Sequence, residues 1–192
     1  MPVDELWYRT DSAARRAERE YYRLVSSYES FLEFEQHRSV SRGRFRTLTD
    51  RVERTGAPFG AHTLVYRPDG SILLVRHRGV GRWVLPGGEV DDTESYEDTA
   101  ERELKEEAGI DAEYRGLALV SRVTFSWEQY ETWGVVPVFE ARARSTTPRI
   151  ADPDDEISAA DWFGDLPEDT REKQWIRRWR DSCRNREVGG AD

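Results

Sequence analysis

The stretch of residues 88–110 reads GEVDDTESYEDTAERELKEEAGI and carries the clearest structural pattern in the chain. Its second half, from about Ser95 to Ala108, contains no Gly or Pro and is rich in Ala, Glu, Leu and Lys, residues that favour helices. Gly109 follows where a helix would end in a left-handed residue. The stretch therefore predicts a helix from Ser95 to Ala108.

Three glutamates lie close together on this predicted helix. At about 100° per residue, Glu103, Glu106 and Glu107 fall within an arc of roughly 100° that borders an apolar stripe. Like charges held this close raise one another's pKa unless a cation offsets the repulsion, and hard carboxylate oxygens suit Mg²⁺ or Mn²⁺. For an isolated cluster in a glutamate-rich chain, the alternative is a solvated helix face.

Two neighbouring features support a site at this helix. Arg102 stands four residues before Glu106 and can reach its carboxylate, which would orient that side chain. Upstream, Leu85-Pro86-Gly87-Gly88 predicts a tight loop whose missing side chains let the backbone approach a metal or a phosphate. We therefore expect Arg102 to support the ligands rather than to contact a substrate.

The whole stretch matches the pattern G-x5-E-x7-R-E-U-x-E-E-x-G-U, with U an aliphatic residue, at every specified position: Gly88, Glu94, Arg102, Glu103, Leu104, Glu106, Glu107, Gly109 and Ile110. This pattern is the Nudix box, so the chain resembles a Nudix hydrolase. The order and spacing of the acids now favour metal binding over a solvated face. The resemblance covers about residues 58–184 and implies an α/β/α sandwich with a mixed β-sheet, here preceded by an N-terminal α-helical extension.

The resemblance also implies a chemistry: Mg²⁺-dependent hydrolysis of a nucleoside diphosphate linked to another group, with Mn²⁺ as the alternative ion. By motif position, Glu106 and Glu107 would be metal ligands and the Gly88 carbonyl a further ligand. Glu103 would be a ligand or the general base. Glu94, like Arg102, would have a supporting role.

Family members place the general base either in the box or in a downstream loop. We favour Glu103, with Glu156 of the Asp154-Asp155-Glu156 loop as the alternative. Three arginines that flank a predicted strand and the glycine loop could hold the terminal phosphates of a substrate, against the alternative of a solvated surface: Arg76, Arg78 and Arg82.

The substrate is less sharply indicated. The approach from Trp83 to Gly88 resembles MutT-type members that remove damaged nucleotides, which favours a nucleoside triphosphate over ADP-ribose or a nucleotide sugar. ADP-ribose-cleaving members often carry a proline downstream of the box, where this chain has Ser126. Aromatic side chains that could stack a base, or belong to the core, are Phe125, Trp127, Tyr130, Trp133 and Trp162. A non-catalytic domain that senses nucleotides or binds a partner is the third hypothesis, although such domains usually lose the box carboxylates that this chain keeps.

Composition excludes several other classes. The net charge of −9 and the pI of about 5.0 argue against general affinity for nucleic acid polymers. No apolar run or signal segment is present, so we expect a cytoplasmic protein with no membrane span. Lys105 and Lys173 are the only lysines among 29 basic residues, which favours a halophilic, salt-rich cytoplasm over a GC-rich genome as the cause. The lone Cys183 excludes an intrachain disulfide.

The N-terminal part has its own pattern. Residues 11–36 lack Gly and Pro, and Ala17, Tyr21, Leu24, Tyr28 and Phe31 recur at helical spacing, which predicts one long amphipathic helix. This helix could pack on the rest of the chain, form a homodimer or present a recognition surface, and we favour the first. Residues 39–55 suggest a connector, with or without a short helix, whose arginines are more often solvated than bound to a substrate: Arg42, Arg44, Arg46, Arg51 and Arg54.

The rest of the chain predicts strands and a closing helix. Ala61–Tyr66 and Ser71–Arg76 flank a Pro-Asp-Gly turn and predict a hairpin. Further predicted elements are strands at Trp83–Leu85, Gly116–Trp127 and Thr132–Ala143, and a helix at Asp169–Arg184. We divide the chain into an extension and linker (1–55), a catalytic domain (56–184) and a tail expected to be disordered (185–192).

Overall fold

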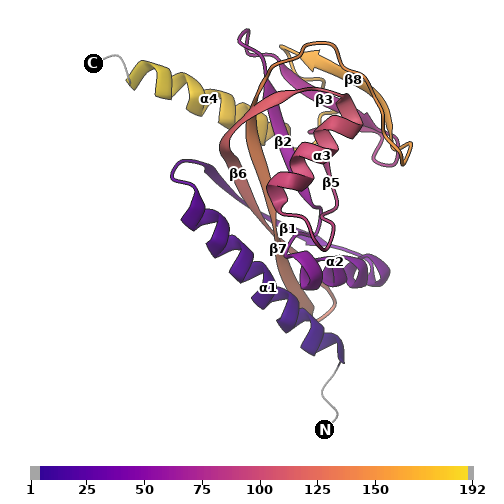
Figure 1. Ribbon diagram of the computed structural model, residues 1–192. Helices are drawn as coiled ribbons and strands as arrows, with labels where there is room; N and C mark the ends of the chain where they lie inside the picture. Colours follow the sequence, from indigo (N-terminus) through magenta and orange to yellow (C-terminus); the bar gives the residue numbers. More distant parts are fainter. Residues whose placement is uncertain (1–4, 190–192) are drawn as a thin grey trace.

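The computed structural model describes residues 5–189, and within that range one mixed sheet of eight strands carries helices on both faces (Figure 1). The strands run in the order β1-β6-β7-β2-β3-β4, while β5 pairs with β2 and β8 pairs with β3. The β1–β6 and β7–β2 pairs are parallel and the others antiparallel. The strands are β1 Leu32–Ser39, β2 Ala61–Tyr66, β3 Ile72–His77, β4 Arg82–Val84, β5 Gly87–Gly88, β6 Ala112–Trp127, β7 Tyr130–Ala143 and β8 Ile157–Phe163.

Alternate residues of the central strands serve the two faces. On β2 and β3, Leu64, Ile72 and Leu74 are fully buried against α4 (Lys173–Gly189), in the cluster that includes Ile176 and Trp179. Their neighbours Val65, Leu73 and Val75 are equally buried on the other face, with Leu104 of α3 (Tyr96–Ala108). Because strand side chains alternate between faces, the same strands supply the apolar side chains against which both helix layers pack. The result is the α/β/α sandwich that the sequence predicts.

The predicted helix of the box is confirmed as α3. Ser95 is the N-cap, and its hydroxyl accepts a hydrogen bond from the Asp98 N–H while the Asp98 carboxylate accepts one from the Ser95 N–H. Gly109 ends the helix with a φ of 61°, a left-handed conformation that glycine adopts without a Cβ penalty. Both ends are therefore determined by residues within the stretch itself.

The predicted strands are also confirmed, with ends that differ by a few residues. The hairpin turns at Asp69 and Gly70, where the Asp69 carboxylate accepts a hydrogen bond of 2.9 Å from the Ser71 N–H. The closing helix α4 begins at Lys173 rather than Asp169 and continues to Gly189, beyond the predicted end at Arg184. The remainder of the predicted tail, residues 190–192, lies outside the described residues.

The single helix predicted over residues 11–36 is wrong in its second half. Helix α1 spans Glu5–Ser27, and the chain then forms β1, which pairs in parallel with β6 from Leu32 opposite Leu119 to Ser39 opposite Ser126. Along β1 half-buried and exposed residues alternate, and Leu32 and Phe34 pack against the core cluster that contains α4. This alternation has the period of a strand, and it follows directly on the helical spacing of α1.

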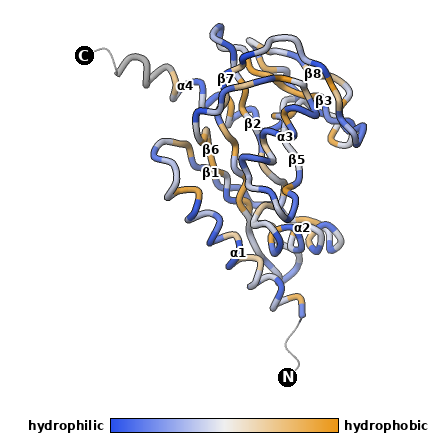
Figure 2. The backbone as a smooth tube through the Cα atoms, in the orientation of Figure 1, coloured by the Kyte–Doolittle hydropathy of each residue, from blue (hydrophilic) through white to orange (hydrophobic). Residues whose placement is uncertain are grey.

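The connector expected at residues 39–55 is a packed helix, α2 (Arg42–Thr55), capped by Ser41 and ended by Gly56. Its buried Phe45, Leu48 and Val52 lie in one cluster with α1 and β6. Helix α1 packs on α2 and β7, as the favoured intramolecular alternative requires. Figure 2 shows hydrophilic and hydrophobic segments alternating along α1, consistent with one packed face. No helix described within residues 5–189 combines the length and apolar character needed to cross a membrane.

Candidate active site

The predicted carboxylates line one cavity of about 650 Å³. Glu103, Glu106 and Glu107 reach it from α3, Gly87 and Gly88 from β5. Glu156 joins them from the loop that precedes β8. The fold thus brings together the residues predicted as ligands and both candidates for the general base, although 53 positions separate Glu103 from Glu156 in the numbering.

Glu107 is the most deeply placed of these acids, with 6% of its surface exposed. One carboxylate oxygen accepts a hydrogen bond of 2.8 Å from the Gly87 N–H. Burial raises the pKa of Glu107 to about 9, against the opposing effect of this hydrogen bond, and the negative charge of Glu103 adds to the rise. A buried carboxylate with this environment is strongly stabilised by a nearby cation.

The glycine loop lies tightly against its neighbours. A Cβ atom on Gly88 would lie 2.3 Å from a carboxylate oxygen of Glu103, so only glycine lets that side chain approach the loop. Burial raises the pKa of Glu103, although Arg102 opposes the rise. The Gly88 carbonyl oxygen lies against Gly60, where a Cβ would be 1.5 Å away. The loop geometry therefore depends on two glycines, one in the box and one outside it.

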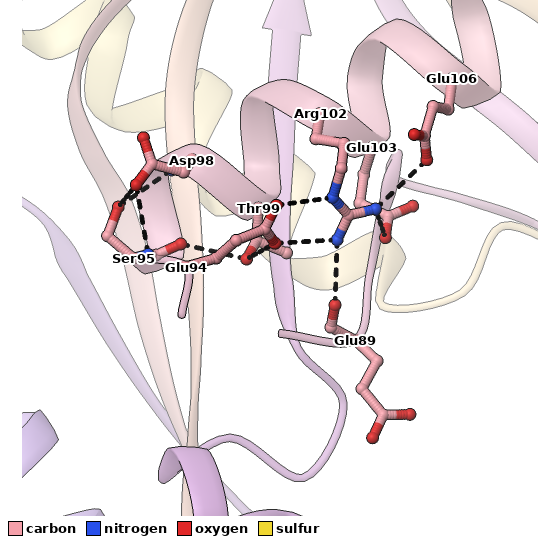
Figure 3. A network of polar contacts seen from close by, with 8 residues as sticks. All are labelled: Glu89, Glu94, Ser95, Asp98, Thr99, Arg102, Glu103 and Glu106. Carbon is pink, nitrogen blue, oxygen red and sulfur yellow. Dashed lines mark hydrogen bonds and ion pairs between the residues drawn. The ribbon is translucent and has the colours of Figure 1, made fainter. Parts of the chain in front are cut away.

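Arg102 connects the box side chains (Figure 3). Its guanidinium donates to both oxygens of Glu94, at 2.8 and 3.0 Å, and one nitrogen donates to Glu103 at 2.8 Å and to Glu106 at 3.2 Å. It also donates to the Glu89 carbonyl at 3.3 Å. The hydrogen bond from Arg102 lowers the pKa of Glu94. The predicted contact between Arg102 and Glu106 is confirmed, and Glu94 holds the arginine in place.

These residues fit a hard divalent cation in the kind of donor they offer. Three carboxylates and a backbone carbonyl supply oxygen only, which Mg²⁺ and Mn²⁺ prefer. Among the residues that the structure describes, no group of three acidic, histidine or cysteine side chains has the arrangement of a complete metal site. Because Arg102 binds Glu103 and Glu106, cation binding would redistribute these contacts.

The three arginines predicted to bind substrate lie elsewhere. Arg76 forms an ion pair with Asp169, Arg78 lies 3.2 Å from Asp155, and Arg82 is exposed at the start of β4. None of the three lines the cavity, and neither do the five aromatic residues considered for base stacking. Of those five, Phe125 is fully buried in the cluster shared with α1 and α2.

Other arginines line the cavity instead: Arg38 from β1, Arg44 and Arg51 from α2, and Arg171 just before α4. Their aromatic companions are Phe59 and Trp175. Arg44 and Arg51 belong to the arginine-rich stretch of residues 42–54, which could have indicated substrate binding. The sequence pattern instead favoured solvated side chains for these arginines. Arg38 and Arg171 carried no local signal, since their positions depend on long-range pairing.

A family model of the NUDIX domain matches residues 57–179. The chain belongs to the Nudix family. A protein of Bacillus subtilis (strain 168) named "Putative 8-oxo-dGTP diphosphatase" is 38% identical over 88 residues, which cover 45% of this chain and 59% of that protein. The Danio rerio "8-oxo-dGDP phosphatase NUDT18" is 27% identical over 149 residues, or 72% of this chain and 44% of that protein. This chain therefore spans 59% of the length of the Bacillus subtilis protein and 44% of the length of the Danio rerio protein.

Among solved structures, a MutT NUDIX hydrolase from Burkholderia pseudomallei is 29% identical, with a TM-score of 0.43. The match covers 61% of this chain and 96% of that one. The Nudix match begins after α2, so α1, β1 and α2 all lie before the matched region. Three of the cavity arginines, Arg38, Arg44 and Arg51, therefore come from a part of this Nudix protein that the family model does not match.

Proposed function

We propose that this Nudix protein is an Mg²⁺-dependent hydrolase, with Mn²⁺ as the alternative ion, that cleaves a diphosphate linkage in a nucleotide. The observation that carries the proposal is the placement of Glu103, Glu106 and Glu107 in one cavity with the Gly87-Gly88 backbone. A nucleoside triphosphate is the preferred substrate, because one relative is named for 8-oxo-dGTP. The second relative is named for the diphosphate 8-oxo-dGDP, which also belongs to the nucleotide class. ADP-ribose or a nucleotide sugar is the second candidate.

In this proposal Glu106 and Glu107 would hold the cation, with the Gly88 carbonyl as a further ligand and Glu103 as either a ligand or the general base. When bound, the cation offsets the charge of the phosphate oxygens and lowers the pKa of a water molecule. The Gly87 N–H fixes the orientation of the Glu107 carboxylate. Arg102 positions Glu103 and Glu106, and Glu94 positions Arg102.

The general base would accept a proton from the attacking water on a carboxylate oxygen. Glu103 is the favoured base, because its side chain is only 14% exposed and burial raises its pKa, which makes it a stronger proton acceptor. Glu156 is the alternative, with a side chain that is 60% exposed and lies 3.5 Å from the His77 ring. The base is the one of the two whose change to Gln lowers kcat and removes the fall in kcat at low pH, where the base would be protonated.

The apolar part of the cavity wall would receive the nucleobase. It is formed by side chains from β6, β7, α4 and the segment before β5: Leu85, Val123, Val136, Val138 and Trp175. Pockets that bind small molecules commonly combine such apolar lining with a few placed polar groups. The polar groups here are the box acids and the arginines.

The test is release of phosphate and pyrophosphate from nucleoside triphosphates, oxidised deoxynucleotides, ADP-ribose and nucleotide sugars, at low and high salt. We expect turnover of one group that stops with chelator. Glu107→Gln should lower kcat by about a hundredfold or more, since even indirect disturbance of metal ligands costs roughly 10–100-fold. The matched control is Glu101→Gln, an exposed residue of the same helix outside this cavity, which should keep full activity.

Equal activity of the two variants would remove Glu107 from the mechanism. Nucleotide binding by folded protein without turnover of any compound would replace the hydrolase with a nucleotide-sensing domain.

A further inference from the structure

Three cavity arginines surround one aromatic ring. The guanidinium carbon of Arg38 lies 5.1 Å from the Phe59 ring centroid, and those of Arg44 and Arg171 each lie 5.8 Å from it. The three arginines come from β1, α2 and the turn before α4, and all of them line the cavity that contains the box glutamates. The ring thus brings three positive charges together on a wall that α3 does not form.

The charges of this group are only partly balanced. Glu172 pairs with Arg38 at 2.6 Å and lies 3.7 Å from Arg171. Arg44, in contrast, has no ion-pair partner among the described residues. Arg51 also lines the cavity, and it forms an ion pair with Glu89, which Arg54 contacts as well. The three guanidinium groups therefore share one carboxylate and keep an excess of positive charge.

The backbone around Arg171 is held by hydrogen bonds to β4. The Arg171 N–H donates a hydrogen bond of 2.8 Å to the Trp83 carbonyl, and Thr170 forms a bridge with the same residue. Glu172 adopts a φ of 53°, an uncommon conformation for a residue other than glycine. Burial and the charges of Arg38 and Arg44 lower the pKa of Arg171. Because an arginine stays protonated in proteins, this repulsion persists until an anion relieves it.

We propose that Arg38, Arg44 and Arg171 form an anion subsite that binds a substrate phosphate other than those held at the box helix. The inference rests on the proposed function and names its substrate class. A nucleoside triphosphate has a third phosphate to place there, whereas the second moiety of a nucleotide sugar is uncharged. Arginine suits this role because its planar guanidinium can make two parallel hydrogen bonds to phosphate oxygens.

The first experiment measures binding of inorganic tripolyphosphate to the full chain by calorimetry, with chelator present so that no cation contributes. We expect Arg44→Gln and Arg171→Gln to weaken binding by about tenfold or more, the typical value of a lost charge-assisted hydrogen bond. Arg44→Lys should recover part of the loss. The matched control is Arg46→Gln, an exposed residue of the same helix outside the cavity, which should bind as the unchanged protein does.

The second experiment separates this inference from the proposed function. With cation present, Arg44→Gln should raise KM for a nucleoside triphosphate by about tenfold and leave KM for ADP-ribose unchanged. Chelator-sensitive turnover with equal constants for Arg44→Gln and Arg46→Gln would overturn the subsite and leave the hydrolase. Arg44-dependent binding of tripolyphosphate without any turnover would support the subsite and overturn the hydrolase.

Discussion

The box helix and the N-terminal segment line the same cavity, but they differ in how their structure is specified. Helix α3 is ended by contacts that span a few residues, from Ser95 to Asp98 and from Gly109 to Lys105. Strand β1 and helix α2 are positioned by partners far along the chain, such as Leu119 and Phe125. Local rules therefore predict α3 to within one residue at each end, whereas they misassign β1.

The two regions also differ in how their charges are arranged. The box acids share Arg102, which binds three of them, and their spacing alone predicts a common face. The cavity arginines have no common spacing, because Arg38, Arg44 and Arg171 belong to three separate elements. The wall formed by the box acids can thus be predicted from a sequence motif. The wall formed by the cavity arginines depends on the folding of the sheet.

The largest effect should come from the core of the N-terminal segment. Phe45 of α2 is fully buried against Phe125 and Trp127. Phe45→Ala should lower the free energy of unfolding by about 3–5 kcal/mol, the usual cost of removing a buried phenylalanine. Urea unfolding at high salt measures it, with the exposed neighbour Arg46→Ala as the control. If both variants unfold alike, α2 is a connector and not part of the core.

The next effect concerns His62 of β2, which lines the cavity between the two regions. Burial, together with the charge of Arg171, lowers the pKa of His62 to about 4. Between that value and its ordinary value near 6.5, the unfolded chain binds more protons than the folded one. The stability that His62 contributes should therefore fall by up to about 3 kcal/mol as the pH drops through this window. Glu107 contributes in the opposite sense above its ordinary value near 4.5, because its raised pKa lets the folded chain keep a proton that the unfolded chain loses.

Chemical unfolding at a series of pH values measures this dependence. The difference in the free energy of unfolding between the unchanged protein and His62→Gln should change by up to about 3 kcal/mol between about pH 6.5 and pH 4, with the exposed His37→Gln as the control variant. A difference that stays constant across this range would assign the proton uptake to other groups.

A smaller effect tests the arginine of the box. Arg102→Lys keeps the charge but loses the fork that holds Glu94, Glu103 and Glu106 together. We expect kcat to fall by roughly 10–100-fold, with little change in the unfolding midpoint, because the helix keeps its caps and its buried face. The control is Arg115→Lys on β6, whose partner Glu113 lies outside the cavity. A loss of stability that matches the loss of activity would make Arg102 a structural residue.

The smallest effect compares the helix starts of the two regions. Ser95 makes both bonds of a capping box, whereas Ser41 accepts one long bond of 3.4 Å from the Arg44 N–H. Ser95→Ala should lower the free energy of unfolding by about 1 kcal/mol and Ser41→Ala by about 0.5 kcal/mol. Thermal unfolding of both variants measures the difference. A larger loss of unfolding free energy in Ser41→Ala than in Ser95→Ala would show that α2 depends on its cap more than on its buried face.

Residues close together in the sequence specify the box helix, its end at Gly109, the strand pair of the hairpin and the shared face of Glu103, Glu106 and Glu107. All of these rest on interactions between residues a few positions apart, for which spacing and residue type are sufficient. The same reasoning placed the contact from Arg102 to Glu106 correctly. The same reasoning also identified the family, because the box has fixed residue types at fixed spacings.

Long-range pairing and packing establish that residues 32–39 form an edge strand, that α2 is a packed helix and that Arg44 and Arg171 line the cavity with the box acids. A strand obtains its hydrogen bonds from another part of the chain, so β1 depends on β6 rather than on its own propensity. The sequence does not show whether an arginine side chain lies in solvent or lines a cavity. Arg44 and Arg46 point to different sides of α2, and long-range packing determines which side faces the cavity.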